Sequence, residues 1–532
     1  MLTSDIPSRP KRHFIDEDLE VKSWSQIENY FQRLLDANIQ SVSDLEQWML
    51  NRSELESVLE EEQAWRYIKM NIDTRDEELS KAFHFWVTEI SPKVAPYSHM
   101  LNVKVSESLF LKELDQEKYR IYLRGLHNTI KIFREENIPL FTEMETKQQE
   151  YGAIAAKMTV EVDGKKMTMQ KAAQFLKDTN RTKRQEVYEK ISQRRAEDVE
   201  KLDVLFDDLI ALRQQIAKNS GFDNYRDYMF AAMGRFDYTP EDCADFHTAI
   251  EKEIVPIIES FDADRKNKMK LEAYKPWDTS VDAEGNAPLK PFEGGEDLID
   301  KSIRCFERLS SYYGQCLSTM KSMKHIDLVS KEGKAPGGFN YPLYEIGVPF
   351  IYMNAVGSQR DLVTMVHEGG HAIHSFLSRD LDLCDFKSTP SEVAELASMS
   401  MELISMDTWD EFYLNEKELA RAKTEQMQKV LEGLPWIAAI DKFQHWIYTT
   451  PHNAEERRAE WKNIMQKLGS SIVDWDGQED ALSNLWQKQL HLYEVPFYYI
   501  EYGMAQLGAI AMWRSYKLLG KEALSNYDEA LK

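Results

Sequence analysis

The sequence predicts a mainly α-helical protein with a small β-sheet beside one helix that carries a metal-binding motif. Glycine (22) and proline (17) are scarce in a chain of 532 residues, which leaves few turns and is typical of long helices. The best strand candidate, residues 349–356, comes directly before the helix with the motif. Apolar residues recur with helical periodicity, and charged faces between them, over residues 24–51, 53–91, 105–157, 170–218 and 240–273.

Three other segments have a recognisable local pattern. Residues 160–169 predict a hairpin, because Asp163-Gly164 is a typical two-residue turn between apolar alternation. Residues 274–296 are rich in proline and glycine and form the longest irregular segment, which is either functional or a connector. Residues 522–532 favour a helix at the carboxy-terminal end of the sequence.

Composition excludes several classes of protein. Aromatic residues make up 11% of the chain, which argues against disorder, and a net charge of −24 argues against nucleic acid as a partner. No run of 18 apolar residues exists, so we expect no membrane-spanning helix. The four cysteines form no C-x-x-C pair, and the first residues lack a signal-peptide pattern. We therefore expect reduced thiols and a cytoplasmic protein.

The most informative stretch is H-E-x-x-H at His367–His371. Positions i and i+4 of a helix lie on one face, so both imidazoles can reach one Zn²⁺ ion. Glu368 stands beside the first histidine, where a carboxylate can take a proton from an attacking water. Gly369 and Gly370 each cost a helix about 1 kcal/mol relative to alanine, which indicates close approach of a substrate or a neighbouring backbone. The pattern predicts metal-assisted hydrolysis, most often of a peptide bond.

The third metal ligand is not fixed by the motif. A metzincin would carry a histidine at position 377, which is leucine here. The next acidic cluster contains Glu392, Glu395 and Glu402 on a predicted helix that Thr389 or Ser391 could cap. Glu395 and Glu402 lie two turns apart on one face, although an amphipathic helix with exposed glutamates would have the same spacing.

Several ordered blocks of this chain resemble the M3 family of zinc oligopeptidases, and most closely its oligoendopeptidase F and Pz-peptidase branch. The resemblance covers roughly residues 100–530. It is carried by His367–His371 with Glu395–Met399, by Gly337–Phe339 and Pro349–Asn354 upstream, by Lys275–Asp278, and by His491 with Pro496–Gly503 downstream.

The resemblance implies roles for the residues of the zinc helix and of the acidic helix. His367, His371 and Glu395 would hold one Zn²⁺ per chain, with Glu368 as the general base. Glu402 would orient an imidazole, and Glu392 remains the rival third ligand because it is only three residues from Glu395.

The resemblance also implies a substrate site. His491, Tyr498 and Tyr502 would take part in catalysis and Tyr499 would bind substrate, but spacing alone equally describes an aromatic core and leaves open which tyrosine contacts the oxyanion. Pro496 could begin the helix of this block. In the predicted strand, the residues expected to pair with an extended substrate are Phe350, Tyr352, Met353 and Asn354.

The resemblance further implies two helical lobes that enclose a deep substrate channel. We expect residues 1–200 to form the amino-terminal lobe and residues 201–532 the catalytic domain. The expected function is a zinc endopeptidase for short oligopeptides, with no nucleic-acid or membrane partner. A dipeptidyl carboxypeptidase or aminopeptidase, and a non-enzymatic peptide-binding protein with structural zinc, are the alternatives. The sequence leaves oligomeric state and residue preference open.

Overall fold

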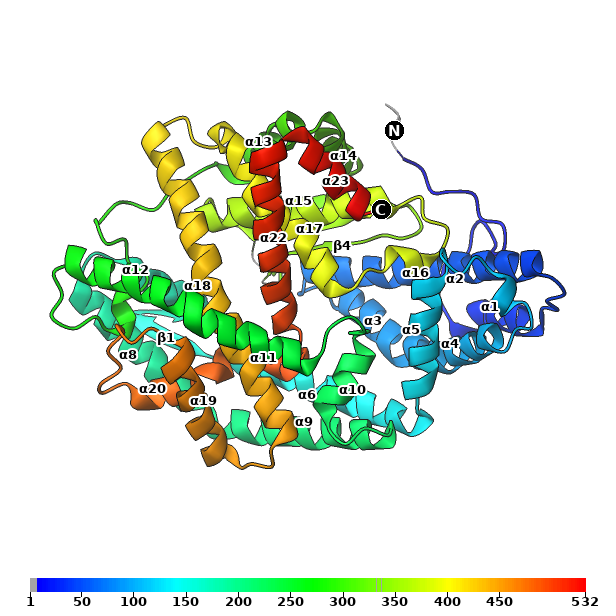
Figure 1. Cartoon of the computed structure of the whole chain (residues 1–532), viewed down its shortest axis with the longest axis horizontal. Coiled ribbons are helices and arrows are strands. Elements are labelled where there is room, and N and C mark those ends of the chain that lie inside the picture. Colours follow the sequence, from blue (N-terminus) through cyan, green and yellow to red (C-terminus); the bar gives the residue numbers. More distant parts are fainter. Residues whose placement is uncertain (1–6, 332, 336) are drawn as a thin grey trace. The chain divides into compact units, whose positions relative to one another are not determined.

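The computed structural model describes residues 7–331, 333–335 and 337–532, and it is mainly helical with little sheet, as predicted (Figure 1). Contacts divide the chain into two compact units that are each discontinuous in sequence. Unit 1 contains the described residues up to Lys131, Pro288–Thr424 and Met504–Lys532, and unit 2 contains Ile132–Ala287 and Glu425–Gly503. The division predicted at residue 200 follows neither unit and stays a prediction.

Unit 1 contains the three-stranded sheet and both helices of the predicted metal site. Its helices are α1 (Trp24–Asp36), α2 (Val42–Ile72), α3 (Glu77–Phe85), η1 (Trp86–Ile90), α4 (Ser91–Ser106), η2 (Leu111–Glu113), α5 (Arg120–Ile132), α13 (Gly294–Leu309), α14 (Ser311–Met323), α15 (Gln359–Ser378), α16 (Cys384–Lys387), α17 (Ser391–Ile404), η7 (Ser405–Glu411) and α23 (Lys521–Ala530).

Unit 2 contains the predicted hairpin and the His/Tyr block. Its helices are η3 (Glu135–Asn137), α6 (Ile138–Ala156), α7 (Met169–Ala173), η4 (Gln174–Lys177), α8 (Arg181–Ala196), α9 (Val199–Asn219), α10 (Tyr225–Ala232), α11 (Pro240–Ala249), η5 (Ile250–Ile254), α12 (Val255–Lys268), η6 (Pro276–Asp278), α19 (Ala454–Leu468), α20 (Glu479–Ser483), η8 (Leu485–Lys488) and α21 (Leu490–Glu494). Three helices contribute residues to both units: α5, through Ile132 alone, α18 (Glu416–Thr449) and α22 (Tyr499–Leu519).

The sheet of unit 1 has the strand order β3-β5-β4. The predicted strand is confirmed as β5 (Phe350–Ala355), which pairs in parallel with β3 (Ile326–Val329) and antiparallel with β4 (Phe339–Tyr341). Five of the six residues of β5 are buried. A strand that is buried on both faces reads as a continuous apolar run, which is why the sequence revealed it.

The predicted hairpin is also confirmed. β1 (Thr159–Val162) pairs antiparallel with β2 (Lys165–Thr168). Asp163 and Gly164 form the turn with φ of 53° and 72°. Two positive φ values are the signature of the type I′ turn, whose twist matches that of the flanking strands.

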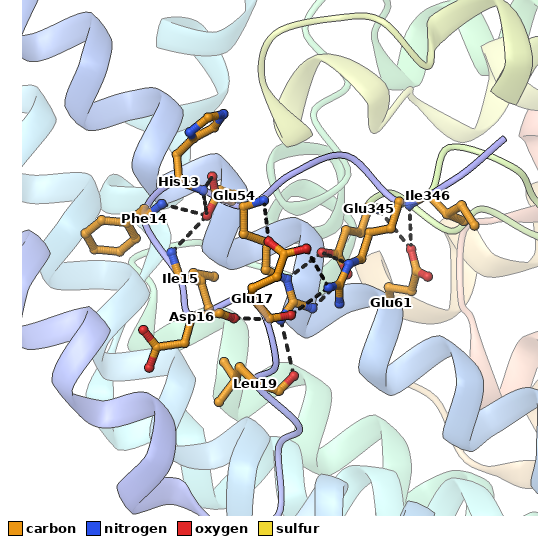
Figure 2. Close-up of polar contacts among 12 residues, drawn as sticks. His13, Phe14, Ile15, Asp16, Glu17, Leu19, Glu54, Glu61, Glu345 and Ile346 are labelled. Atoms are coloured by element: carbon orange, nitrogen blue, oxygen red, sulfur yellow. Dashed lines mark hydrogen bonds and ion pairs between the residues drawn. The ribbon is translucent and has the colours of Figure 1, made fainter.

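The amino-terminal segment is tied to α2 and to the loop between β4 and β5 (Figure 2). The backbone amides of residues 13–15 donate to the Glu54 carboxylate of α2 at 2.8–3.0 Å. The buried Arg12 guanidinium donates to both Glu345 carboxylate oxygens, at 2.6 and 3.0 Å. Glu61 of α2 accepts the Glu345 amide at 2.9 Å. Charge-assisted bonds of this kind are about twice as strong as neutral ones, so they hold the entry to β5.

The four cysteines, Cys243, Cys305, Cys316 and Cys384, are all buried and free. Free buried thiols agree with the expectation of reduced cysteines. Among the helices of the described ranges, none is long and apolar enough to cross a lipid bilayer.

Candidate metal centre

Helix α15 begins with a complete capping box four residues after β5. The Ser358 hydroxyl accepts the Asp361 amide at 3.3 Å, and the Asp361 carboxylate accepts the Ser358 amide at 2.9 Å. Two amides that have no partner within the helix are thereby satisfied. The cap fixes where the helix starts, and with it the face on which the two motif histidines project.

The two motif histidines lie on one face of α15, with ring centroids 4.9 Å apart at 85°. On the neighbouring helix α17, Glu395 places its Oε2 atom 3.4 Å from His367 Nε2 and 4.0 Å from His371 Nε2. Possible ligand atoms of the three residues all lie within 4.8 Å of one another. The structure therefore brings together the three residues that the sequence predicted as metal ligands.

Gly370 allows the close contact between α15 and α17. A Cβ atom at this position would lie 2.6 Å from Ser398 Cα and 3.0 Å from the Ala397 carbonyl oxygen. Real Cβ atoms do not approach a backbone this closely, so no other residue fits between the helices at this distance. Gly369 faces the other way, and its Cβ would lie 2.6 Å from the Phe306 ring of α13. The two glycines therefore allow close contact with other parts of the protein, the backbone of α17 at Gly370 and the Phe306 ring of α13 at Gly369.

Helix α17 also contacts the carboxy-terminal helix α23. The buried Tyr527 hydroxyl donates to the Ala397 carbonyl at 2.8 Å. At the start of α17, Pro390 occupies the cap position without a side-chain bond, so the predicted cap by Thr389 or Ser391 is wrong. Proline fixes φ near the helical value and can precede a helix without a hydroxyl cap.

Glu402 contacts the ligand cluster through the imidazole of His367. Its Oε1 atom is 2.7 Å from His367 Nδ1, which leaves Nε2 of that ring directed toward Glu395. Burial lowers the pKa of His367, but the hydrogen bond and charge of Glu402 outweigh it and raise the pKa to about 9. Burial and the nearby His367 lower the pKa of His371 well below its usual value. One ring is thus poised to carry a proton and the other to be neutral.

The donor set fits Zn²⁺. A tetrahedral ion with bonds of about 2.05 Å separates its ligand atoms by about 3.3 Å. The separation of 3.4 Å between His367 Nε2 and Glu395 Oε2 is close to this value, and that of 4.0 Å between His371 Nε2 and Glu395 Oε2 exceeds it by about 0.7 Å. Among the described residues, Glu392 does not belong to the group of converging ligand atoms. The geometry therefore favours Glu395 over its rival.

Glu368 is buried beside the ligand cluster, with 5% of its surface exposed. Burial raises the pKa of this carboxyl group to about 7; His367 opposes the shift and Glu395 adds to it. Edge strand β4 lies alongside, because the side-chain Nδ2 of Asn340 donates to the Glu368 carbonyl oxygen at 3.5 Å. The sequence pattern does not predict β4, since three residues are too few to show a period.

The substrate-pairing role predicted for β5 is wrong. β5 is the central strand, with β3 on one side and β4 on the other, so its main chain is already paired. Of the four residues predicted to bind substrate, Phe350, Tyr352 and Met353 are at most 3% exposed, and the Asn354 amide donates to the carbonyl oxygens of residues 335 and 337. An extended peptide could add only to an edge strand.

The His/Tyr block forms one aromatic cluster in unit 2. The His491 ring lies 4.9 Å from Tyr499 and 6.1 Å from both Tyr498 and Tyr502. The helix of this block, α22, begins at Tyr499 and not at Pro496, because Phe497 has a left-handed φ of 67°. The metal-ligand cluster belongs to unit 1, so the contact of a tyrosine with the reacting atoms stays a prediction.

Gln489 links two side chains of the block, Tyr499 and His491. The Tyr499 hydroxyl donates to Gln489 Oε1 at 3.0 Å, and the amide of the same Gln489 lies 2.7 Å from His491 Nδ1. Burial lowers the pKa of His491 to about 4, which leaves its imidazole neutral near pH 7. Gln489 thus fixes Tyr499 and His491 together, a link that no spacing in the sequence indicates.

His374 of α15 is a buried core residue, and burial lowers its pKa to about 4.

Comparison with known proteins agrees with this geometry. The model of peptidase family M3 matches residues 174–296 and 313–532, and the model of the peptidase M3 N-terminal domain matches residues 14–133. Oligopeptidase PepF of Bacillus subtilis is 24% identical over 301 residues, 55% of this chain and 43% of that protein. The chain spans less than half the length of each curated relative that it matches.

Solved structures with the same fold cover nearly the whole chain. A Pz peptidase A determined with an inhibitor has a TM-score of 0.87 and 26% identity over 96% of this chain and 91% of its own. A structure described as an oligoendopeptidase F has a TM-score of 0.86 and 25% identity over 98% of this chain and 91% of its own. The resemblance inferred from the sequence blocks is confirmed.

Proposed function

This chain belongs to peptidase family M3, and we propose that it is a zinc-dependent endopeptidase that hydrolyses internal bonds of short oligopeptides. The observation that carries the proposal is the convergence of two imidazoles and one carboxylate on one point, beside a buried glutamate. His367, His371 and Glu395 would hold the ion. A structural zinc site would need no adjacent base, so the presence of Glu368 favours a catalytic site over a structural one.

A bound Zn²⁺ would polarise the scissile carbonyl and acidify water at the open coordination position. Glu368 accepts a proton from the attacking water and returns it to the leaving amine. Beside a dication, its pKa falls from the value of about 7 that burial gives, so the carboxylate is ionised at neutral pH and can act as a base.

Glu402 acts through His367. Its carboxylate accepts a hydrogen bond from Nδ1–H, which selects the tautomer whose Nε2 lone pair faces Glu395. Outer carboxylates of this kind orient an imidazole ligand and make it more basic. Gly370 positions the ligands through the backbone, because it sets the separation between α15, which carries the two histidines, and α17, which carries Glu395.

The substrate is proposed to be an extended oligopeptide that adds to the outer edge of β4. β4 has a partner on one side only among the described strands, and it reaches the Glu368 carbonyl through Asn340. Main-chain pairing at an edge strand tolerates many side chains, so sequence preference should be broad. His491 and Tyr499 would contact the substrate, and Tyr498 or Tyr502 would donate a hydrogen bond to the oxyanion.

A peptide blocked at both ends tests the proposal. The wild-type protein should cut an internal bond of an acetylated and amidated peptide of roughly 5–20 residues, a span that an edge strand can hold, while a stable folded protein stays intact. Glu368→Gln should retain zinc by metal analysis and lose about 10²–10⁴-fold in kcat. Cleavage only of peptides with a free end would contradict an endopeptidase, and near-wild-type kcat in Glu368→Gln would place the base elsewhere.

A further inference from the structure

Unit 2 contains a second cluster of metal-ligand residues, formed by two helices. Cys243 and His247 stand four residues apart on α11, and Asp441 and His445 stand four residues apart on α18. The spacing of four places both members of each pair on one helix face. Two such faces meet here, since His247 Nε2 lies 2.8 Å from Asp441 Oδ2.

Three of these residues have ligand atoms that converge. The Cys243 sulfur, an Asp441 oxygen and a His445 nitrogen lie within 4.8 Å of one another, as in the cluster of α15 and α17. His247 Nε2 holds Asp441 Oδ2, and His445 Nε2 lies 3.3 Å from the same oxygen, whereas Asp441 Oδ1 has no hydrogen-bond partner among the described residues. Asp441 is fully buried, and a buried carboxylate oxygen without a partner is costly. A metal ion bound to Asp441 Oδ1 would give this oxygen the partner that it lacks.

The charges of the cluster suit a divalent cation. Cys243 as thiolate and Asp441 as carboxylate would neutralise an ion of charge +2, so that no net charge is buried. Burial raises the pKa of the Cys243 thiol, so an ion would displace the thiol proton into solvent on binding. Arg235 interacts with Asp441 and Cys243, but its guanidinium is paired with Glu501 at 2.8 Å, which offsets its positive charge.

We propose that Cys243, Asp441 and His445 form a second zinc site, separate from the catalytic one, that clamps α11 to α18 within unit 2. Asp441 binds through Oδ1, while His247 holds Oδ2 and orients the carboxylate. Water completes the coordination on the side of His445, whose side chain is 13% exposed. A donor set with a thiolate favours Zn²⁺ over Mg²⁺ or Ca²⁺, which prefer oxygen ligands alone.

The clamp also reaches the segment that leads into the His/Tyr block. The His445 ring packs on Phe497 with centroids 5.6 Å apart at 79°. Phe497 is buried and has a left-handed φ of 67°, a conformation that a bulky residue rarely adopts unless its surroundings impose it. Its amide donates to Gln444 Oε1 of α18 at 2.5 Å. An ion that fixes His445 would therefore steady the turn before α22.

The test uses the full chain with the candidate catalytic site emptied by His367→Ala and His371→Ala. This background variant, stripped with a chelator and loaded with Co²⁺, should retain about one ion per chain and show a thiolate-to-cobalt charge-transfer band. The catalytic cluster contains no cysteine, so the band reports on the second site alone. Adding Cys243→Ser should abolish the band and lower the affinity for Co²⁺ at least ten-fold. The matched control Cys305→Ser, at a buried thiol 2.9 Å from the Thr408 hydroxyl, should leave both unchanged.

A second measurement covers the case in which Cys243→Ser does not fold. Zn²⁺ should raise the melting temperature of the background variant and leave that of background His445→Gln unchanged, with circular dichroism to check folding. Retention of no metal by the background variant would overturn the proposal, as would a cobalt band that survives Cys243→Ser. The background lacks the catalytic ligands, so neither outcome depends on whether the chain is a peptidase.

Discussion

Gly370→Ala should damage the metal centre without touching a ligand. The added methyl group would lie 2.6 Å from Ser398 Cα and 3.1 Å from Met401 Cβ, both on α17. Carbon atoms in ordinary contact are about 3.5–4.0 Å apart, so the two helices must separate by about 1 Å at this point. Gly370 precedes His371 directly, and Ser398 is one turn after Glu395, so the separation acts where these two ligands meet.

Two opposing terms set the effect on stability. Overpacking of a close contact costs about 1–3 kcal/mol, whereas alanine in place of glycine gains about 1 kcal/mol in a helix. The free energy of unfolding should therefore fall by about 0–2 kcal/mol, and the protein should still fold. The effect on the site is larger, because the 4.0 Å between His371 Nε2 and Glu395 Oε2 already exceeds the separation for tetrahedral zinc. We expect zinc affinity to fall about 10–100-fold, and kcat/KM at saturating zinc to fall about 100-fold.

The assay pairs zinc titration and peptide hydrolysis with thermal unfolding. Gly125→Ala is the matched control, because its Cβ on α5 would meet no atom within 4 Å. It should leave zinc affinity unchanged and raise stability by up to about 1 kcal/mol. Gly369→Ala would press on the Phe306 ring of α13, which can tilt, and should affect stability more than zinc. Normal zinc affinity in Gly370→Ala would refute the view that this glycine sets the helix separation.

Three further predictions concern individual side chains. Glu395→Ala should remove most of the zinc affinity, whereas Glu402→Ala should lower it about 10–100-fold. Competition with a chromophoric chelator measures both affinities, and equal losses would contradict the different roles of the two residues. Because Glu402 raises the pKa of His367 to about 9 against the effect of burial, zinc must displace a proton below that pH. Apparent zinc affinity should therefore rise about tenfold per unit between about pH 6 and pH 8 and level off above about pH 9, and a flat profile would argue against it. Tyr498→Phe or Tyr502→Phe, whichever removes the oxyanion donor, should lower kcat by about 10²–10³ with little change in KM, and two harmless changes would return these residues to the core.

The part of the site that lies within one helix could be predicted from sequence, because helix geometry is fixed. His367 and His371 share a face of α15 whatever surrounds them, and the capping box at Ser358 is local as well. Their distance to Glu395 depends on how two helices pack. The glycine pair indicated that something comes close, but only the structure shows that it is the backbone of α17.

The error about β5 has a different cause. A buried apolar run identifies a strand but not its neighbours, so Phe350–Ala355 could equally be an edge or a central strand. Its partner β4 is three residues long, and the loop between them is held by Glu61 and Glu345, which the sequence places far apart. The edge available to a substrate therefore could not be identified until pairing was known.

In each candidate metal site one helix supplies two of the three ligands at a spacing of four residues, but only the first pair belongs to a recognisable motif. In the first, both imidazoles come from five consecutive residues, so the motif is visible. In the second, Asp441 and His445 have the same spacing on α18, but an aspartate with a histidine one turn later forms no known motif. The third ligand, Cys243, comes from α11, and His247 one turn after it holds a carboxylate oxygen instead of converging with the ligand atoms. A cysteine with a histidine one turn later is common in helices without any ion. What distinguishes this pair is Asp441, whose second oxygen has no hydrogen-bond partner among the described residues although it is fully buried. An unsatisfied buried acceptor is a property of packing, so a ligand set split between helices can be recognised only after the helices are placed.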